Sequence, residues 1–204
     1  AALQPATFTI AADIYVNSTA QLAWWTIFDC TTYPAWALRN ENSADSRLGG
    51  RVVFSDGGYI SVFPASALAV GWHTVAMTYD GTTLAIYHDG ASAGSSSTIT
   101  GGGGSRTINY SAQYMTIGNN QSNPTTRYFD GAIDNLLFYS GAKSAGWVSA
   151  FHYSDYTRPG LVCLRAPKEH SIGLDLGEMK VSPSAMTFEL NDILDPNATD
   201  GSKY

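Results

Sequence analysis

Apolar residues fall at every second position along several short segments of the chain. The clearest segments are residues 72–79 and 84–88, which are rich in β-branched and aromatic residues and contain no proline. An Asp-Gly pair follows each of them, at residues 80–81 and 89–90. Asp and Gly tolerate the positive φ angles of tight turns. The pattern therefore predicts two strands that form an antiparallel hairpin, with a turn after each strand.

The same two-residue period predicts further strands before and after this hairpin. They cover residues 8–16, 20–30, 36–39, 51–54, 59–63, 114–118 and 132–139. Residues 95–106 contain four consecutive glycines, which predict either a flexible surface excursion or a place where backbone approaches another chain. Residues 144–152 predict a short helix. Many short strands with so little helix indicate an all-β fold.

Three segments carry, in order, a resemblance to a known family. The central hairpin reads Trp-His-x-Val-Ala, Tyr-Asp-Gly and Leu-x-Ile-Tyr-x-Asp-Gly, residues 115–118 read Met-Thr-Ile-Gly, and residues 128–139 contain Phe-Asp-Gly-Ala-Ile-Asp. Together they resemble the laminin-G-like, concanavalin A-like jelly-roll domains, which include lectins and glucanases. The resemblance implies a two-sheet antiparallel jelly-roll sandwich, here residues 1–155. It does not cover the C-terminal extension, residues 156–204.

The extension offers a strand that the sandwich lacks. In the resembled family one or two strands precede the Phe-Thr-Ile strand, whereas only residues 1–7 precede it here. A missing strand leaves unpaired backbone groups at a sheet edge, and natural proteins cover such edges. Residues 186–190 (MTFEL) alternate between apolar and polar. We expect the extension to pack on the sandwich and to supply this strand, to its own domain or to a neighbouring copy.

Composition narrows the choice of environment and partner. Charged residues make up 14% of the chain, whereas a soluble domain usually has about 25%. The net charge of −6 is spread along the chain, so no basic stripe predicts nucleic-acid binding. No apolar run approaches the roughly 20 residues of a membrane-spanning helix. A surface this rich in hydroxyl and amide groups favours an extracellular location.

Two cysteines, Cys30 and Cys163, match no zinc or redox spacing. In an oxidising compartment they could form a disulfide that ties the extension to the sandwich, which would stabilise the fold by up to about 4–5 kcal/mol. The alternative is two unlinked, buried thiols.

Four asparagines stand in Asn-x-Ser/Thr motifs: Asn17, Asn109, Asn120 and Asn197. Each has the form of an N-glycosylation acceptor, although about two such motifs would arise by chance in a chain this rich in Ser and Thr. Asn109, Asn120 and Asn197 fall in predicted loops, where a glycan could be attached.

No residue pattern predicts catalysis. Retaining glycosidases need two carboxyl groups about 5–5.5 Å apart. In the glucanase branch of the resembled family these groups belong to an E-x-D-x-x-E motif. None of the four glutamates stands in that pattern, and neither a G-x-S-x-G nor an H-E-x-x-H motif occurs. The histidines, His73 among them, are expected to be structural. We therefore predict a non-catalytic protein.

Calcium is the one cofactor that the resemblance implies, because related laminin-G-like domains often hold it at the rim of the sandwich. Its ligands would be loop oxygens, and the candidates are Asp56, Asp130 and Asp134. Asp56 and Asp130 each precede a glycine, and an Asp-Gly pair also favours a tight turn without any metal. Asp134 lies within an apolar strand, where its carboxylate needs a metal or, as we favour, a backbone donor.

Three residues in and after the loop that follows residue 30 are candidates for ligand binding: Tyr33, Trp36 and Arg39. Their rings could stack on a sugar face while the guanidinium donates to its hydroxyl groups. The alternative is that Trp36 caps the core and Arg39 is solvated. The function we expect is an extracellular recognition or adhesion module that binds glycan or protein through its rim loops. The alternative function is a structural subunit of a fibre, appendage or virion that self-associates through its C-terminal tail.

Overall fold

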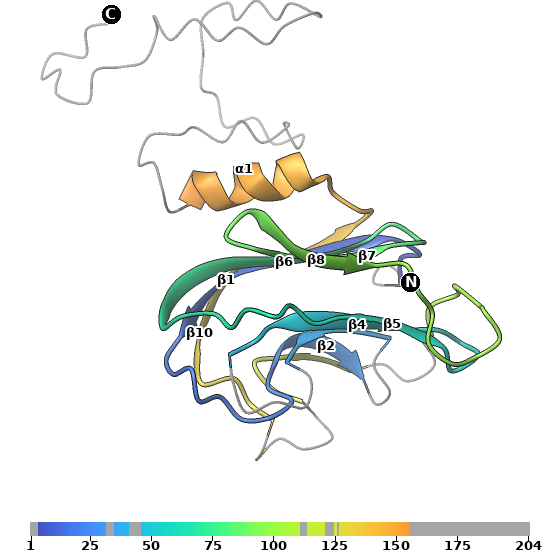
Figure 1. The fold of residues 1–204 in the computed structure, drawn as a ribbon, viewed down its shortest axis with the longest axis horizontal. Coiled ribbons are helices and arrows are strands. Elements are labelled where there is room, and N and C mark those ends of the chain that lie inside the picture. Colours follow the sequence, from blue (N-terminus) through green and yellow to red (C-terminus); the bar gives the residue numbers. More distant parts are fainter. Residues whose placement is uncertain are drawn as a thin grey trace, which may run out of the picture. The chain divides into compact units, whose positions relative to one another are not determined.

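The structure is a computed structural model, and it describes residues 4–31, 35–40, 46–110, 114–120, 125 and 127–155 (Figure 1). They belong to one compact unit, Ala1–Leu161. The C-terminal extension, with its predicted strand, lies outside the described residues. Within the described part, no helix is both long enough and apolar enough to cross a bilayer.

Two antiparallel sheets of five strands each form a sandwich, as the sequence predicted (Figure 1). Sheet A has the strand order β10-β1-β6-β7-β8, and sheet B has the order β5-β4-β3-β2-β9. The elements are β1 (Phe8–Val16), β2 (Thr26–Thr31), β3 (Trp36–Arg39), β4 (Gly49–Val53), β5 (Tyr59–Val62), β6 (Gly71–Tyr79), β7 (Leu84–His88), β8 (Ala91–Ser96), β9 (Tyr114–Ile117), β10 (Gly131–Ser140) and α1 (Ala145–Asp155).

The central hairpin of the sequence analysis is β6 and β7, paired from Val75 opposite His88 to Tyr79 opposite Leu84. Strand β1 pairs with β6 along its whole length. These strands form where predicted because their alternating apolar residues face one core, so the local pattern and the tertiary packing agree.

Two elements differ from the prediction. Strand β2 begins only at Thr26, because the preceding residues form a loop that is tied across the sandwich: Gln21 Nε2 donates to the carbonyl of Asp130 at 2.8 Å, and Asp130 N donates to Gln21 Oε1 at 3.0 Å. Residues 91–96 (ASAGSS) form strand β8, although they carry little hydrophobic signal. Pairing with β7 places them in the sheet, so tertiary context outweighs local propensity there.

The main core lies between the sheets and is rich in aromatic residues, with Trp25, Trp36 and Tyr79 among its largest fully buried side chains. Helix α1 covers the outer face of sheet A, where Val148 and Phe151 form a second small cluster with side chains of β1, β6 and β7. Figure 1 shows the helix lying across this sheet.

Candidate functional site

Trp36 is a core residue rather than a ligand platform. Its side chain is 0% exposed, and its ring centroid lies 5.0 Å from that of Phe28 and 5.3 Å from that of Phe138. It points inward because its Cα partners, Cys30 and Val52, are also core positions. The hypothesis that Trp36 stacks on a sugar is therefore wrong, and the alternative that it belongs to the core holds. Tyr33 lies outside the described residues.

A different tryptophan, Trp24, is partly exposed in the loop between β1 and β2. The guanidinium of Arg39 lies 5.1 Å from its ring centroid, and the guanidinium of Arg127 lies 5.4 Å from it. Both distances are within the range of cation–π attraction. Arg39 is thus part of this cluster and only 5% exposed, not solvated. We call Trp24, Arg39 and Arg127 the rim cluster.

The rim cluster is held by hydrogen bonds between loops that are distant in the sequence. Trp24 N donates to Asn40 Oδ1 at 3.4 Å, and Asn40 N donates to the carbonyl of Trp25 at 2.9 Å. Asn40 Nδ2 donates to the carbonyl of Arg47 at 2.7 Å. Trp24 itself has a φ of 67°, in the left-handed region that bulky residues rarely adopt. Such strain, of order 1–3 kcal/mol, is often found at functional sites.

Chemically, the rim cluster combines an apolar ring with two planar cations. Arg127 is partly buried, and it makes no hydrogen bond or ion pair with the described residues. Its donors can therefore serve a ligand. A guanidinium suits carboxylate and sulfate groups because it can donate two parallel hydrogen bonds.

A buried carboxylate that the sequence did not predict lies on the outer face of sheet B. Asp29 is fully buried, and it accepts hydrogen bonds from Thr116 Oγ1 at 2.5 Å and from Asn120 Nδ2 at 2.8 Å. Asn120 is only 2% exposed. The prediction of a glycan on Asn120 is therefore wrong, because the nitrogen that would carry the glycan is buried and donates to Asp29.

Asp56 uses both carboxylate oxygens to bind backbone. It accepts hydrogen bonds from the N–H groups of Ser105 at 2.8 Å, Gly58 at 3.0 Å and Gly103 at 2.7 Å. These bonds, the one from Ser105 foremost, lower the pKa of Asp56. The glycine run is thus an exposed excursion anchored by Asp56. At Gly102, which has a φ of +64°, a Cβ would overlap the backbone of Gly58.

The other two calcium candidates also have partners in the protein. Asp134 is exposed, and its Oδ1 accepts from the backbone N–H of Asn135 at 2.8 Å, which is the backbone donor that the sequence analysis favoured. Asp130 Oδ1 accepts from Asn17 Nδ2 at 3.1 Å. Within the described ranges, no three acidic, histidine or cysteine side chains gather as a metal site would require. Calcium binding stays a prediction.

The remaining modification candidates divide between the described residues and the extension. Cys30 is buried, and burial, together with the neighbouring Asp29, raises the pKa of its thiol to about 11. Cys163 and Asn197 lie outside the described residues, so the disulfide stays a prediction. Asn17 is exposed and Asn109 is partly buried. Glycosylation of both also stays a prediction.

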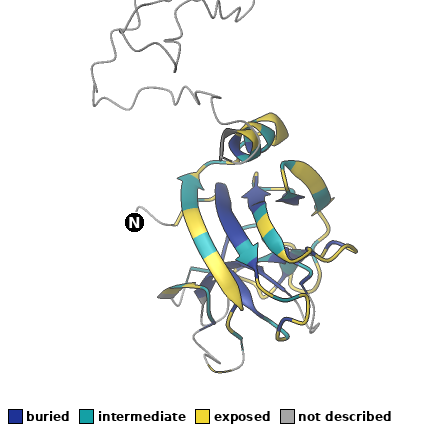
Figure 2. Cartoon of the chain, turned by 90° about the vertical axis from the view of Figure 1, so that its left-hand side faces the viewer, coloured by how far each residue is buried: buried dark blue, intermediate teal, exposed yellow. Residues whose placement is uncertain are grey.

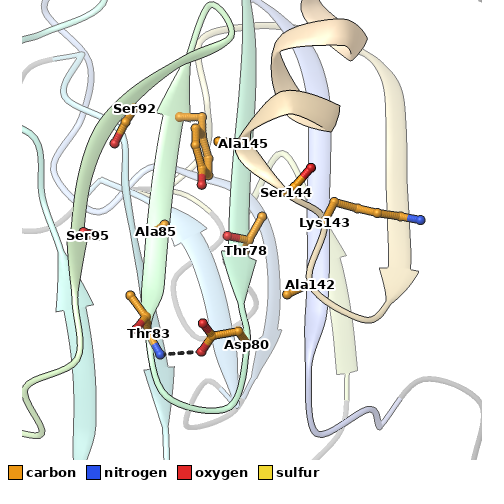
Figure 3. A pocket seen from close by; sticks show the side chains of 11 residues that line it. Thr78, Asp80, Thr83, Ala85, Ser92, Ser95, Ala142, Lys143, Ser144 and Ala145 are labelled. Carbon is orange, nitrogen blue, oxygen red and sulfur yellow. Dashed lines mark hydrogen bonds between the residues drawn. The ribbon is translucent and has the colours of Figure 1, made fainter. Parts of the chain in front are cut away.

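A shallow pocket lies on the outer face of sheet A beside the start of α1 (Figure 3). It encloses about 310 Å³. Asp80 is its one carboxylate, and it accepts backbone hydrogen bonds from Thr82 and Thr83. The ammonium of Lys143 points out of the pocket, toward the ring of Tyr139. The other polar side chains that line the pocket carry hydroxyl groups: Thr78, Thr83, Tyr87, Ser92, Ser95 and Ser144. One carboxylate cannot supply the acid and nucleophile pair of a glycosidase.

His73 and Asp89 form an ion pair, with 2.8 Å between Nδ1 and Oδ2. The hydrogen bond to Asp89 is the main cause that raises the pKa of His73. Burial opposes ionisation of Asp89, but hydrogen bonds from His73 and from Thr74 N outweigh it and lower the pKa of Asp89. The pair closes the turn after β7.

The stabilisation from this pair is expected to depend on pH. Because the pKa of His73 is raised on folding, its contribution is complete below the ordinary histidine pKa of about 6.5 and is lost as pH rises through the raised value. Asp89→Asn should cost about 0.5–1 kcal/mol at pH 5.5, a small figure because the pair is partly exposed, and less at pH 8.5. Urea unfolding at both pH values measures this. Asn also tolerates the φ of 50° at this position, so the variant tests the charge alone. Equal losses at both pH values would contradict the prediction.

Comparison with known proteins places these features in a family. The family model described as the concanavalin A-like lectin/glucanases superfamily matches residues 1–149. No match was found among curated proteins.

Solved structures share the fold at low sequence identity. A candidate carbohydrate-binding protein from Bacteroides ovatus is 20% identical, with a TM-score of 0.55 over 71% of this chain and 40% of that chain. The CBM40 of the Ruminococcus gnavus IT-sialidase, bound to α2,3-sialyllactose, is 15% identical, with a TM-score of 0.55 over 72% and 82% of the two chains. Domain 4 of the Geobacillus stearothermophilus arabinanase AbnA, in complex with arabinotriose, is 17% identical, with a TM-score of 0.55 over 74% and 68%.

This chain spans less than half of the Bacteroides ovatus protein. Such identities show a shared fold and no more. The family model covers most of the chain, and the two-sheet sandwich agrees with it. The chain therefore belongs to the concanavalin A-like lectin/glucanase superfamily.

Proposed function

We propose that this domain is an extracellular, non-catalytic carbohydrate-binding module that holds a sugar at the rim cluster. The observation that carries the proposal is the partly exposed Trp24 ring with the guanidinium groups of Arg39 and Arg127 within 5.5 Å of its centroid. Two proteins of the same fold were solved with a saccharide, sialyllactose in one and arabinotriose in the other. These two proteins support a saccharide as the class of ligand. The position of the proposed site is argued from the residues of this chain alone.

An indole ring suits a sugar because one face of a pyranose presents C–H groups, which pack on an aromatic face, while its hydroxyl groups remain at the edge for hydrogen bonding. The guanidinium donors of Arg127 beside the ring can reach these hydroxyls. A carboxylate or sulfate on the sugar would bind the guanidinium more strongly than a hydroxyl does, since charge-assisted hydrogen bonds contribute about 1.5–3 kcal/mol each. The proposed ligand is therefore a glycan that carries an anionic sugar.

The proposal is tested with the full chain on an array of neutral, carboxylated and sulfated glycans. We expect binding to acidic glycans that weakens as salt increases, because exposed charges are screened. Trp24→Ala and Arg127→Ala should each weaken binding at least about tenfold, which corresponds to 1.4 kcal/mol. Arg127→Lys should recover only part of the loss, since an ammonium cannot form the bidentate contact.

The matched control is Trp72→Ala, which removes another partly exposed tryptophan, from sheet A, where it contacts Tyr15. This variant should bind like the parent. Thermal unfolding of every variant separates loss of binding from loss of fold. Two results would overturn the proposal: no binding to any arrayed glycan, or parental affinity in both the Trp24→Ala and Arg127→Ala variants.

A further inference from the structure

The floor of the pocket beside α1 is built by cross-strand pairs on the outer face of sheet A. Thr78 of β6 is the Cα partner of Ala85 in β7, and Ala85 is the partner of Ser95 in β8. Tyr87 and Ser92 form a second pair, two residues further along β7. Because paired residues on adjacent strands point to the same face of a sheet, these five side chains line one pocket.

The pocket is hollow because its floor carries small side chains. Ala85, Ser92 and Ser95 are short, and α1 begins only at the rim of the pocket, where Ala145 lines it. Strand β8 is exposed or half-buried, whereas β1 and β7 in the same sheet are almost entirely buried (Figure 2). The weakly hydrophobic residues 91–96 therefore leave room for a ligand beside the helix.

Two hydroxyl groups of this pocket are nearly enclosed and still lack a protein partner. Thr78 is 6% exposed and Tyr87 is 9% exposed. Neither side chain makes a hydrogen bond with any residue that the structure describes. Buried polar groups ordinarily have a hydrogen-bond partner. Since both side chains line the pocket, a molecule bound there can supply it.

The charges around the pocket favour a neutral ligand. Asp80 Oδ1 accepts hydrogen bonds from the N–H groups of Thr82 at 2.8 Å and Thr83 at 2.7 Å, whereas Oδ2 accepts none from the described residues. The ammonium of Lys143 lies 4.8 Å from the ring centroid of Tyr139 and points out of the pocket (Figure 3). An anion would therefore meet the carboxylate of Asp80 without a cation to balance it.

We propose that this pocket binds a short neutral saccharide. Sugar hydroxyl groups both donate and accept, so they can donate to Asp80 Oδ2 and exchange hydrogen bonds with Thr78 and Tyr87. The methyl groups of Ala85 and Ala145 offer apolar contact to the C–H groups of the sugar ring. The pocket volume of about 310 Å³ lies at the lower end of the roughly 300–1,000 Å³ of ligand pockets, which suits a small ligand.

This second site does not rest on the rim cluster. The rim cluster presents guanidinium groups, whereas this pocket presents hydroxyl groups and one carboxylate. The domain would thus hold two sugars of different charge at two separate sets of residues.

The test is a titration of the full chain with glucose, galactose, mannose and N-acetylglucosamine, followed by NMR of the backbone amides. At least one sugar should shift, saturably, the amides of residues 83–87, 92–95 and 144–145. Its affinity should be the same at low and high salt, because a neutral ligand has no charge to screen.

Three variants locate the sugar. Thr78→Val removes a hydroxyl without a protein partner and should weaken binding at least about threefold, the effect of one neutral hydrogen bond. Asp80→Asn keeps an oxygen that accepts from Thr82 and Thr83, and it should weaken binding at least about fivefold, because it removes the charge-assisted bond. Ala85→Leu fills the floor of the pocket and should abolish binding.

The matched control is Thr82→Val, which changes the neighbouring threonine of the same turn. Thr82 is exposed and does not line the pocket, so this variant should bind the sugar as the parent does. Thermal unfolding of every variant separates loss of binding from loss of fold.

The two proposed sites can fail separately. Trp24→Ala should leave the neutral sugar bound, and Thr78→Val should leave the binding of acidic glycans unchanged. No amide shift at the pocket with any of the four sugars would overturn the inference. So would parental affinity in both Thr78→Val and Ala85→Leu, or loss of the neutral sugar in Trp24→Ala, which would place that sugar at the rim cluster.

Discussion

Replacing Trp36 with alanine should lower the free energy of unfolding by about 3–5 kcal/mol, the usual cost of removing a large buried aromatic side chain. The side chain has no exposure, and its ring packs on Phe28 in sheet B and on Phe138 in sheet A. It therefore joins the two sheets. Alanine would leave a cavity that the flanking strands cannot close, because β3 is paired on both sides. Urea unfolding measures the loss.

Trp36→Phe is the control that separates stability from recognition. It refills part of the cavity, so its cost should be clearly smaller, about 1–3 kcal/mol. It should bind glycans as the parent does, because Trp36 has no surface to offer a ligand. A Trp36→Ala variant with parental stability would contradict the core assignment. A folded Trp36→Phe variant with weakened glycan binding would show that Trp36 contributes to the binding site.

The strands could be predicted because their signal is local. Residues 8–16 and 71–88 alternate and end in turn residues, and the structure places strands there with nearly the predicted bounds. Strand β8 could not be predicted, since its small polar residues lie in the sheet only through pairing with β7. The loop before β2 likewise depends on Asp130, which is more than 100 residues away in the sequence.

The site was predicted only in part, because the choice between two tryptophans depends on packing. The sequence offers Trp24 and Trp36 as similar aromatic residues near loops, and the structure buries Trp36 while it leaves Trp24 partly exposed beside Arg39. Arg127 comes from a distant loop, and no motif links it to Trp24. Only the cross-strand register, which turns the side chain of Trp36 toward the core, distinguishes the buried tryptophan from the exposed one.

The buried acids were missed for a related reason. Alternation assigns Asp13 to the face of β1 that points away from the core, where polar residues are ordinarily solvated. Asp29 lies on an outer face because the register of β2 shifts between Thr26 and Phe28, which alternation does not predict. In the structure both are fully buried and hydrogen-bonded. Burial on an outer face arises from what packs over the sheet, and the period of a single strand carries no information about that.

Asp13 connects three strands beneath helix α1. Its Oδ1 accepts from Thr74 Oγ1 of β6 at 2.9 Å, and its Oδ2 accepts from Asn135 Nδ2, also at 2.9 Å, at the bulge where the register between β1 and β10 shifts. His152 of α1 contacts the same threonine, with 3.1 Å between Nδ1 and Oγ1. The carboxylate is thus the centre of a polar network that fixes the bulge and the helix to sheet A.

Asp13→Ala is therefore expected to lower the free energy of unfolding by about 1–3 kcal/mol, because the donor on Thr74 would remain buried without its acceptor and the exposed amide of Asn135 would lose its bond to β1. Asp13→Asn has the same shape and should cost less, since its amide oxygen still accepts from Thr74 while its NH₂ group faces the donor of Asn135. Urea unfolding of Asp13→Ala, Asn135→Gly and the double variant tests the network: glycine accepts the φ of 48° but removes the amide. If the carboxylate of Asp13 and the amide of Asn135 act together, the losses of the two single variants will be less than additive in the double variant. Additive losses, or an Asp13→Ala variant as stable as the parent, would show that Asp13 does not hold the bulge.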